Sequence, residues 1–244
     1  MKKIFAFTLA ETLIVMGVIG IVSALTLPNL NSSTGDKERV AKVKKIYQNL
    51  NDALGRAEAV YGPYSDWFIN DANSTAKAKR ASERITEFMK ISKICGTATG
   101  CFKNGFVGKL NGTASVSDFD NDTTGIYKFI TADETSVAII NGSGDDEGYN
   151  WKVQVDIDGP AKGPHVAGKD IFRFNLDEAG TLSPTGNEKT FDSLLSNLKS
   201  GGRYASAWII KYDNADYLQF QSVSGSTATC KNGNTVTEAN PRCK

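Results

Sequence analysis

The sequence predicts an α+β fold in which one long N-terminal helix is followed by an antiparallel β-sheet. An almost uncharged apolar run covers residues 7–27, and a helical stripe of apolar residues continues as far as Tyr61. From Cys101 onward the chain changes to short β-favouring runs separated by Gly, Asn and Asp. These observations predict that the amphipathic half of the helix packs on the sheet and that its apolar half protrudes.

Composition excludes several classes of protein. The chain has 244 residues, of which 40% are hydrophobic, so it is long enough to bury a sizeable core in one or two domains. Its 28 Lys and Arg residues nearly balance 27 Asp and Glu residues, which leaves no surplus of cations for phosphates and argues against a nucleic-acid partner. His165 is the only histidine, so sites that need two imidazoles are excluded.

Residues 7–27 form an apolar run that begins soon after Lys2 and Lys3. As a helix this run would rise about 32 Å, close to the roughly 30 Å hydrocarbon core of a bilayer. The two lysines favour a cytoplasmic N-terminus with the rest of the chain translocated. On shape alone, the run fits a cleaved secretory signal ending at residues 22–24, a plain signal anchor or a more specialised segment.

Glu11 is the one charged residue in the run, and it bears on these three interpretations. A carboxylate at the centre of a membrane span costs about 2.5–3.5 kcal/mol, so such a residue generally has a partner. The positive end of the helix dipole offsets part of this cost, and an α-amino group on a neighbouring subunit would offset more. A secretory signal gives no reason for Glu11.

The same residues resemble a known family. The string AFTLAETLIVM at residues 6–16, followed by small residues and by Pro28, resembles the class III signal of type IV prepilins and type II secretion pseudopilins. The resemblance implies that a prepilin peptidase cuts between Ala6 and Phe7, with Ala6 in place of the usual Gly, and that Phe7 is then N-methylated. It also implies that Glu11 pairs with the Phe7 amine of a neighbouring subunit and fixes the axial register.

The resemblance implies a division of the chain into three parts. Residues 1–6 would be the leader peptide, residues 7–28 a transmembrane and filament-core helix, and residues 29–244 an exported globular pilin-like domain. Within that domain, residues 29–62 would form the amphipathic half of the long helix. The implied α+β fold is the pilin lollipop, in which the long N-terminal helix has a protruding apolar half and packs on an antiparallel β-sheet head.

The function implied by the resemblance is structural, not enzymatic. The chain would be a subunit of a type IV pilus or a type II secretion pseudopilus. It would sit in the bacterial inner membrane with its head outside the cytoplasm before it enters the filament. Its partners would be homologous subunits, prepilin peptidase, and the assembly platform with its ATPase. The alternative is a membrane-anchored or signal-peptidase-cleaved secreted binding module or adhesin.

Periodicity and turn residues predict the remaining elements. Further helices are expected over residues 75–93 and 188–199. Spacings of three and four residues define the apolar stripe of the first helix, which consists of Val40, Val43, Tyr47, Leu50, Leu54, Ala57 and Tyr61. Strands are expected over residues 125–131, 136–141, 151–156, 170–175, 181–183, 207–212 and 217–222.

The four cysteines, Cys95, Cys101, Cys230 and Cys243, predict two disulfide bonds in an exported chain. Four cysteines can pair in three ways, and we favour the pairing with two local bonds, Cys95–Cys101 and Cys230–Cys243. A zinc site is disfavoured because neither pair has the tight Cys-x₂₋₄-Cys spacing that such sites use. A bridged loop at the C-terminus also resembles the surface-exposed disulfide region of many type IV pilins.

The sequence lacks the common signatures of catalysis: it has no nucleophile elbow, zinc-protease helix, Walker loop or dinucleotide fingerprint. His165 lies in a turn-rich loop and is predicted to be a surface residue. Acidic clusters at residues 118–122, 145–147 and 156–158 contain oxygen ligands that suit Ca²⁺, but none forms a full EF-hand loop, so solvated turns are favoured. We therefore expect no cofactor, with Ca²⁺ as the one alternative.

Overall fold

The protein is represented by a computed structural model that describes residues 9–115, 117–142 and 149–243, without the side chains of residues 23–34. The chain divides into two compact units, Met1–Glu38 and Arg39–Lys244. Helix α1, Leu9–Tyr61, begins in the first unit and ends in the second. All the other helices and strands belong to the second unit.

Within the second unit, α1 buries the apolar stripe that its sequence spacing predicts. Val43 and Leu50 are almost completely buried, and Tyr47 stacks on Phe174 of the sheet with ring centroids 5.4 Å apart. Ile46 and other residues between the predicted positions are buried as well, so the apolar face is wider than a single stripe. Gly62 follows the helix with φ +79°, a left-handed conformation that suits glycine at the end of a helix.

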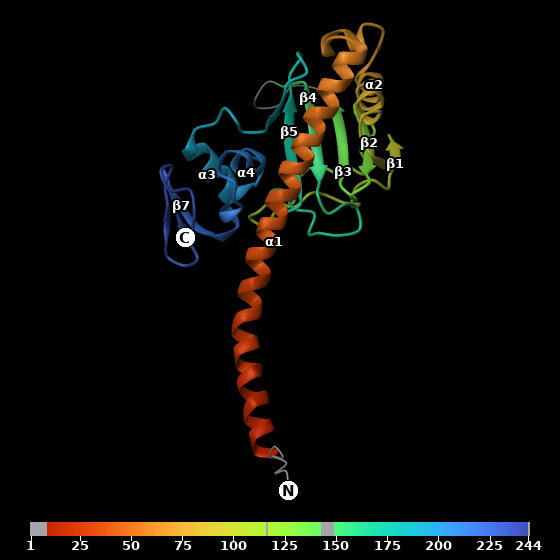
Figure 1. Ribbon diagram of the computed structural model, residues 1–244. Helices are drawn as coiled ribbons and strands as arrows, with labels where there is room; N and C mark the ends of the chain where they lie inside the picture. The colour runs from red at the N-terminus through yellow and green to blue at the C-terminus, as the bar shows by residue number, and fades with distance from the viewer. Residues whose placement is uncertain (1–8, 116, 143–148, 244) are drawn as a thin grey trace. The chain divides into compact units, whose positions relative to one another are not determined.

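The main sheet has six antiparallel strands in the order β1-β2-β3-β4-β5-β6, so each strand pairs with its neighbours in sequence. Figure 1 shows β1 to β5 side by side, with α1 crossing them. At one rim, β1 pairs with β2 through two irregular steps in register, and at the other β6 ends in Pro184. The strand bounds are Ile91–Gly96 (β1), Ile126–Thr131 (β2), Ser136–Asn141 (β3), Trp151–Asp156 (β4), Ile171–Leu176 (β5) and Leu182–Pro184 (β6).

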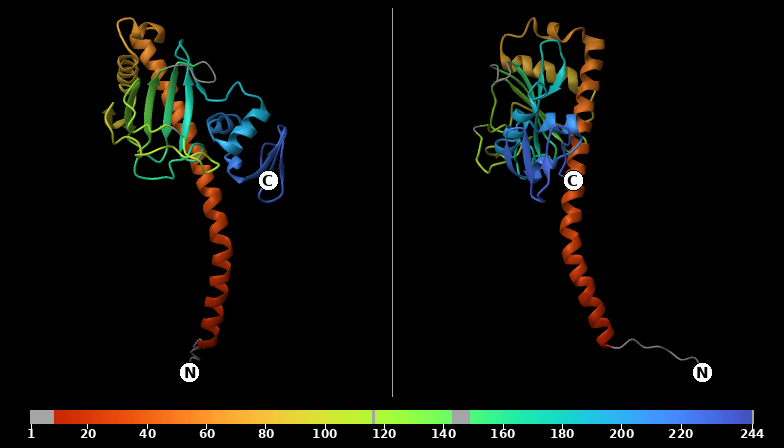
Figure 2. Two further views of the ribbon diagram at one scale, coloured as in Figure 1. Left: turned by 180° about the vertical axis from the view of Figure 1, so that it is seen from behind. Right: turned by 90° about the vertical axis from the view of Figure 1, so that its left-hand side faces the viewer.

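Side chains of both faces of this sheet are buried. On one face, Val137, Val155 and Phe172 belong to the core that α1 also forms. On the opposite face, Ala138 and Ile171 pack against residues of the 101–119 segment in a second, smaller core. This alternation is the period of two expected of a strand. The side view in Figure 2 shows α1 on one side of the sheet and the long connecting segments on the other.

Shorter helices pack beside the strands. α2, Ser74–Thr86, contacts β2 and β3, and the side chain of Asn73 caps its N-terminus by accepting from the Ala76 N–H. α3, Phe191–Ser200, is capped in the same way by Thr190. α4, Ala205–Tyr212, contacts β5 and β6.

The C-terminal region forms a second sheet of three strands in the order β7-β8-β9. Its strands are Phe220–Ser224 (β7), Thr227–Cys230 (β8) and Thr235–Val236 (β9). Figures 1 and 2 show this sheet next to α3 and α4, at the end of the main sheet away from β1. Short 3₁₀ helices at Tyr64–Phe68 (η1) and Asp216–Gln219 (η2) connect larger elements.

The predicted pilin lollipop with a long apolar helix is wrong. Although α1 is long, no helix among the described residues combines the length and apolar character needed to cross a membrane. The apolar part of α1 with described side chains covers residues 9–22, which is shorter than the roughly 20 residues that a membrane-spanning helix needs. The structure shows a six-stranded antiparallel sheet accompanied by short helices.

Two further expectations are corrected. Residues 207–212, predicted to be a strand, belong to helix α4, where Trp208 and Ile209 are completely buried. The helix predicted over residues 75–93 ends at Thr86, and β1 begins at Ile91 within the same range. In both places packing against the sheet overrides the preference of the local sequence.

Candidate functional site

The first candidate site is the N-terminal part of α1, residues 9–22, where every side chain is exposed. Large apolar side chains occupy four consecutive positions from Leu13 to Met16. Four consecutive residues of an α-helix point in four directions, so the apolar surface surrounds the helix instead of forming one stripe. Such a surface needs an apolar environment on every side, either lipid or several neighbouring helices.

Glu11 lies in the first turn of α1, within this apolar surface, and its side chain is exposed. A carboxylate in the first turn interacts favourably with the positive end of the helix dipole. Thr12 donates a hydrogen bond from its hydroxyl to the Leu9 carbonyl at 2.9 Å. Ala6 and Phe7, the predicted cleavage and methylation residues, lie outside the described residues.

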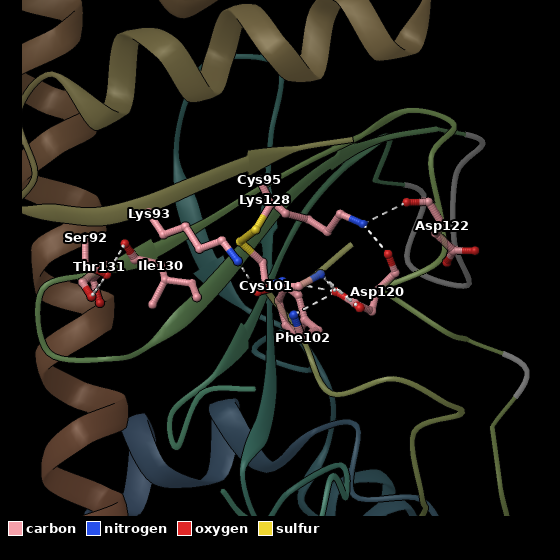
Figure 3. The surroundings of a disulfide bond; sticks show 11 residues. Ser92, Lys93, Cys95, Cys101, Phe102, Asp120, Asp122, Lys128, Ile130 and Thr131 are labelled. Carbon is pink, nitrogen blue, oxygen red and sulfur yellow. Dashed lines mark hydrogen bonds between the residues drawn. A yellow bond between two sulfur atoms is a disulfide. The ribbon is translucent and has the colours of Figure 1, made fainter. Parts of the chain in front are cut away.

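The second candidate site is the disulfide between Cys95 at the end of β1 and Cys101 in the following loop (Figure 3). Asp120, which is buried, lies beneath this loop. Its Oδ1 accepts hydrogen bonds from the backbone N–H groups of Gly100 at 2.8 Å, Cys101 at 3.1 Å and Phe102 at 3.0 Å. One carboxylate therefore holds three consecutive residues of the bridged loop.

Lys128 is fully buried beside Asp120, at the centre of β2. Its ammonium group donates to the backbone carbonyls of Asp120 at 2.6 Å and Asp122 at 3.1 Å. Burial lowers the pKa of Lys128, while the nearby carboxylates oppose that shift. The sequence analysis did not single out Lys128. It lies two residues from the apolar Ile126 and from the apolar Ile130, so all three share one face of the strand, and this pattern signals a lysine on an apolar face.

The third candidate site is the C-terminal disulfide between Cys230 and Cys243. Cys230 is completely buried at the end of β8. The Cys243 N–H donates to the Asp216 carboxylate at 2.7 Å, and the Asn232 side chain donates to the Cys243 carbonyl at 2.6 Å. Both disulfides are local in sequence, which is the connectivity favoured above.

His165, predicted to be a surface residue, is buried. Its backbone has φ +56°, and its N–H donates to the Asp170 carboxylate at 2.6 Å. The imidazole Nδ1 lies 3.9 Å from Oδ2 of the fully buried Asp156, and Nε2 lies 3.3 Å from the Gly105 carbonyl oxygen. The prediction failed because turn-forming neighbours suggested an exposed loop, whereas the 101–119 segment covers it.

The pKa values of these buried groups are shifted. Burial raises the pKa of both Asp156 and Asp170, because a desolvated carboxylate favours its protonated form. The nearby Asp156 carboxylate raises the pKa of His165, against the opposite effect of burial. Asp156 also accepts from the Asp158 N–H at 3.0 Å and from the Gly159 N–H at 3.1 Å, so the cluster ties its own loop together.

The acidic clusters that the structure describes form no metal centre. Among the residues that the structure describes, no group of three or more His, Cys, Asp or Glu residues could hold a metal ion. Residues 145–147 lie outside the described residues. Asp120 and Asp156 are buried acceptors of backbone hydrogen bonds, not the solvated turn residues expected from the sequence.

Comparison with known proteins adds no relative. No protein-family profile, curated protein or solved structure matches the chain.

Proposed function

We propose that the protein is a structural subunit of a type IV pilus or type II secretion pseudopilus, and that it assembles through its apolar N-terminal segment. The observation that carries the proposal is the exposed apolar surface of residues 9–22. A surface of this kind is stable only when other apolar groups cover it, and in a polymer those groups are supplied by further copies.

The size of the exposed surface supports assembly as its purpose. Nine large hydrophobic side chains in this segment are more than half exposed, with Leu9 at 80% and Met16 at 75%. Covering each such side chain is worth about 1.5–3 kcal/mol relative to water, so leaving all nine in water costs roughly 14–27 kcal/mol. In the proposal this surface is therefore covered at each stage, first at the inner membrane and then by neighbouring helices in the filament.

Glu11 gives the proposed contact its register. Within a bundle of apolar helices, a carboxylate is stable only opposite a cation or strong donor. After cleavage behind Ala6, the new α-amino group would belong to Phe7, four residues before Glu11. In the proposed filament, Glu11 of one subunit pairs with Phe7 of the next, so a shift along the helix axis breaks the pair.

The two disulfides support export, because disulfides persist in oxidising compartments. The proposal places the second unit, Arg39–Lys244, outside the cytoplasm; we call it the globular unit. Before assembly, the subunit lies at the bacterial inner membrane. Prepilin peptidase, related subunits and an ATP-driven assembly platform are the partners it requires. The protein is proposed to catalyse no reaction.

Intact mass spectrometry of the protein extracted from cells tests the proposed processing. A mature chain that begins with N-methylated Phe7 supports the proposal. A chain that begins at Leu25 contradicts it and favours a secreted binding module instead.

Electron microscopy of cells carrying Glu11 variants tests assembly. Glu11→Ala and Glu11→Gln should abolish filaments while the amount of subunit stays at the wild-type level. Glu178→Gln, an exposed turn residue of the globular unit, is the matched control and should leave filaments intact. Normal filaments in the Glu11→Ala strain would contradict the proposed register contact.

A further inference from the structure

We infer that the globular unit binds a small acidic sugar in a cavity on the face of the sheet opposite α1. The cavity has a volume of about 420 Å³, within the range of sites that hold small molecules. Its floor is formed by β4 and β5, and its walls by residues within 107–115 and 117–119 and by the end of α3. This inference is independent of the proposed function, because it rests on a different part of the chain.

Backbone hydrogen bonds fix the walls of the cavity before any ligand enters. The Gly108 N–H donates to the His165 carbonyl at 2.8 Å, and the Gly108 carbonyl accepts from the Ala167 N–H at 2.8 Å. The Asn111 N–H donates to the Ser200 carbonyl at 3.1 Å, which joins the loop to the end of α3. A preformed site avoids much of the ordering cost of binding.

The charge of the lining selects an anion. Lys109, Arg173 and Arg203 line the cavity, whereas none of the described residues that line it is Asp or Glu. The orientation of the Arg173 guanidinium is fixed, because its Nε donates to Oε1 of Gln154 at 3.1 Å. These two residues are paired across β4 and β5. A guanidinium held in one orientation suits a carboxylate or a phosphate, since both accept its parallel N–H donors.

The rest of the lining suits a ring that bears hydroxyl groups. Amide and hydroxyl side chains, which both donate and accept, line the cavity at Asn111, Ser115 and Asn197. Val107 and Phe119 also line the cavity, but both are buried, so the polar side chains define its chemistry. Cations, amides and hydroxyls together match a monosaccharide that carries a carboxylate or phosphate.

Isothermal titration of the full chain in mild detergent tests the inference with three probes: glucuronate, glucose 6-phosphate and neutral glucose. We expect at least one acidic sugar to bind and glucose not to bind. Binding of glucuronate alone identifies a carboxylate site, and binding of glucose 6-phosphate alone identifies a phosphate site. Failure of both acids to bind at concentrations up to about 20 mM, or equal binding of glucose, overturns the inference.

Variants locate the binding. Arg173→Gln should weaken binding of the acidic sugar by about 10- to 100-fold, because a charge-assisted hydrogen bond is lost. Lys109→Gln, at an exposed position that the fold tolerates, should also weaken binding, whereas Arg242→Gln outside the cavity should not. Thermal unfolding verifies that each variant is folded. Wild-type affinity in both Arg173→Gln and Lys109→Gln, or an equal loss in Arg242→Gln, overturns the assignment.

Discussion

Replacing Asp120 with alanine should destabilise the protein while leaving the Cys95–Cys101 bond formed. The carboxylate accepts from the N–H groups of Cys101 and Phe102, which are buried, and from that of Gly100, which is exposed. Water can replace the carboxylate at Gly100 but not at the two buried donors. Each buried N–H left without an acceptor costs about 1–3 kcal/mol, so the free energy of unfolding should fall by about 2–6 kcal/mol.

Two companion variants sharpen this prediction. Asp120→Asn keeps one carbonyl oxygen that can accept from the same donors, so its loss should be smaller, about 1–2 kcal/mol. Glu238→Ala, an exposed residue in the segment after β9, is the control for removing a carboxylate and should change stability by less than about 0.5 kcal/mol.

Equilibrium unfolding in urea, followed by tryptophan fluorescence of the oxidised full chain, measures all three variants. A thiol assay on the same samples shows whether both disulfides are intact. If Asp120→Ala unfolds within about 0.5 kcal/mol of the wild type with its disulfides formed, the argument from buried donors is refuted.

Three further predictions concern other parts of the globular unit. The pKa of His165 is raised above 6.5, so the stabilising effect of its charged form is complete below pH 6.5 and is lost as the pH rises through the raised pKa. Between pH 6 and 9 the free energy of unfolding should therefore fall less in His165→Gln than in the wild type. The same pH dependence of unfolding in both proteins would contradict this. Replacing Cys230 and Cys243 with alanine opens a loop closed at a sequence separation of 13, and should lower the free energy of unfolding in urea by about 3 kcal/mol, against about 2.4 kcal/mol for the shorter loop of the other pair. In calorimetry, Leu50→Ala in the core should cost about 2–5 kcal/mol and the exposed Val60→Ala less than about 0.5 kcal/mol, and similar losses would contradict the packing of α1.

The strands at the centre of the main sheet were predictable from the sequence. β3 and β4 begin and end at the predicted residues, because each is a β-favouring run bounded by turn-forming residues. The apolar stripe of α1 was also predictable from its spacing, since Val43, Leu50 and Leu54 are all buried.

Helix α4 shows where local sequence is insufficient. The run Ala207–Trp208–Ile209–Ile210 favours a strand, and a short apolar run has no period that distinguishes a strand from a buried helix. Its helical form depends on distant residues, because Trp208 packs between Phe191 of α3 and Phe220 of β7. No local window contains this information.

Some residues of the candidate sites were predictable from local sequence, and others were not. A short motif suffices to single out Glu11, and the count and spacing of cysteines suffice to suggest local disulfides. The proximity of Asp120 to Lys128 and of Asp156 to His165 escapes such reasoning, because each depends on how a loop folds against a strand of the sheet. Burial then changes the chemistry of residues whose sequence neighbours suggest exposed turns.

The two edge strands of the main sheet, β1 and β6, affect whether copies of the protein pair with one another at high local concentration. Exposed strand edges invite pairing with another chain, and proteins commonly block such pairing with bulges, short strands and proline. Here the irregular register of β1 interrupts one edge, while the other is limited to the three residues of β6, the last of which is Pro184. Copies of this sheet brought close together should therefore not pair through these two edges.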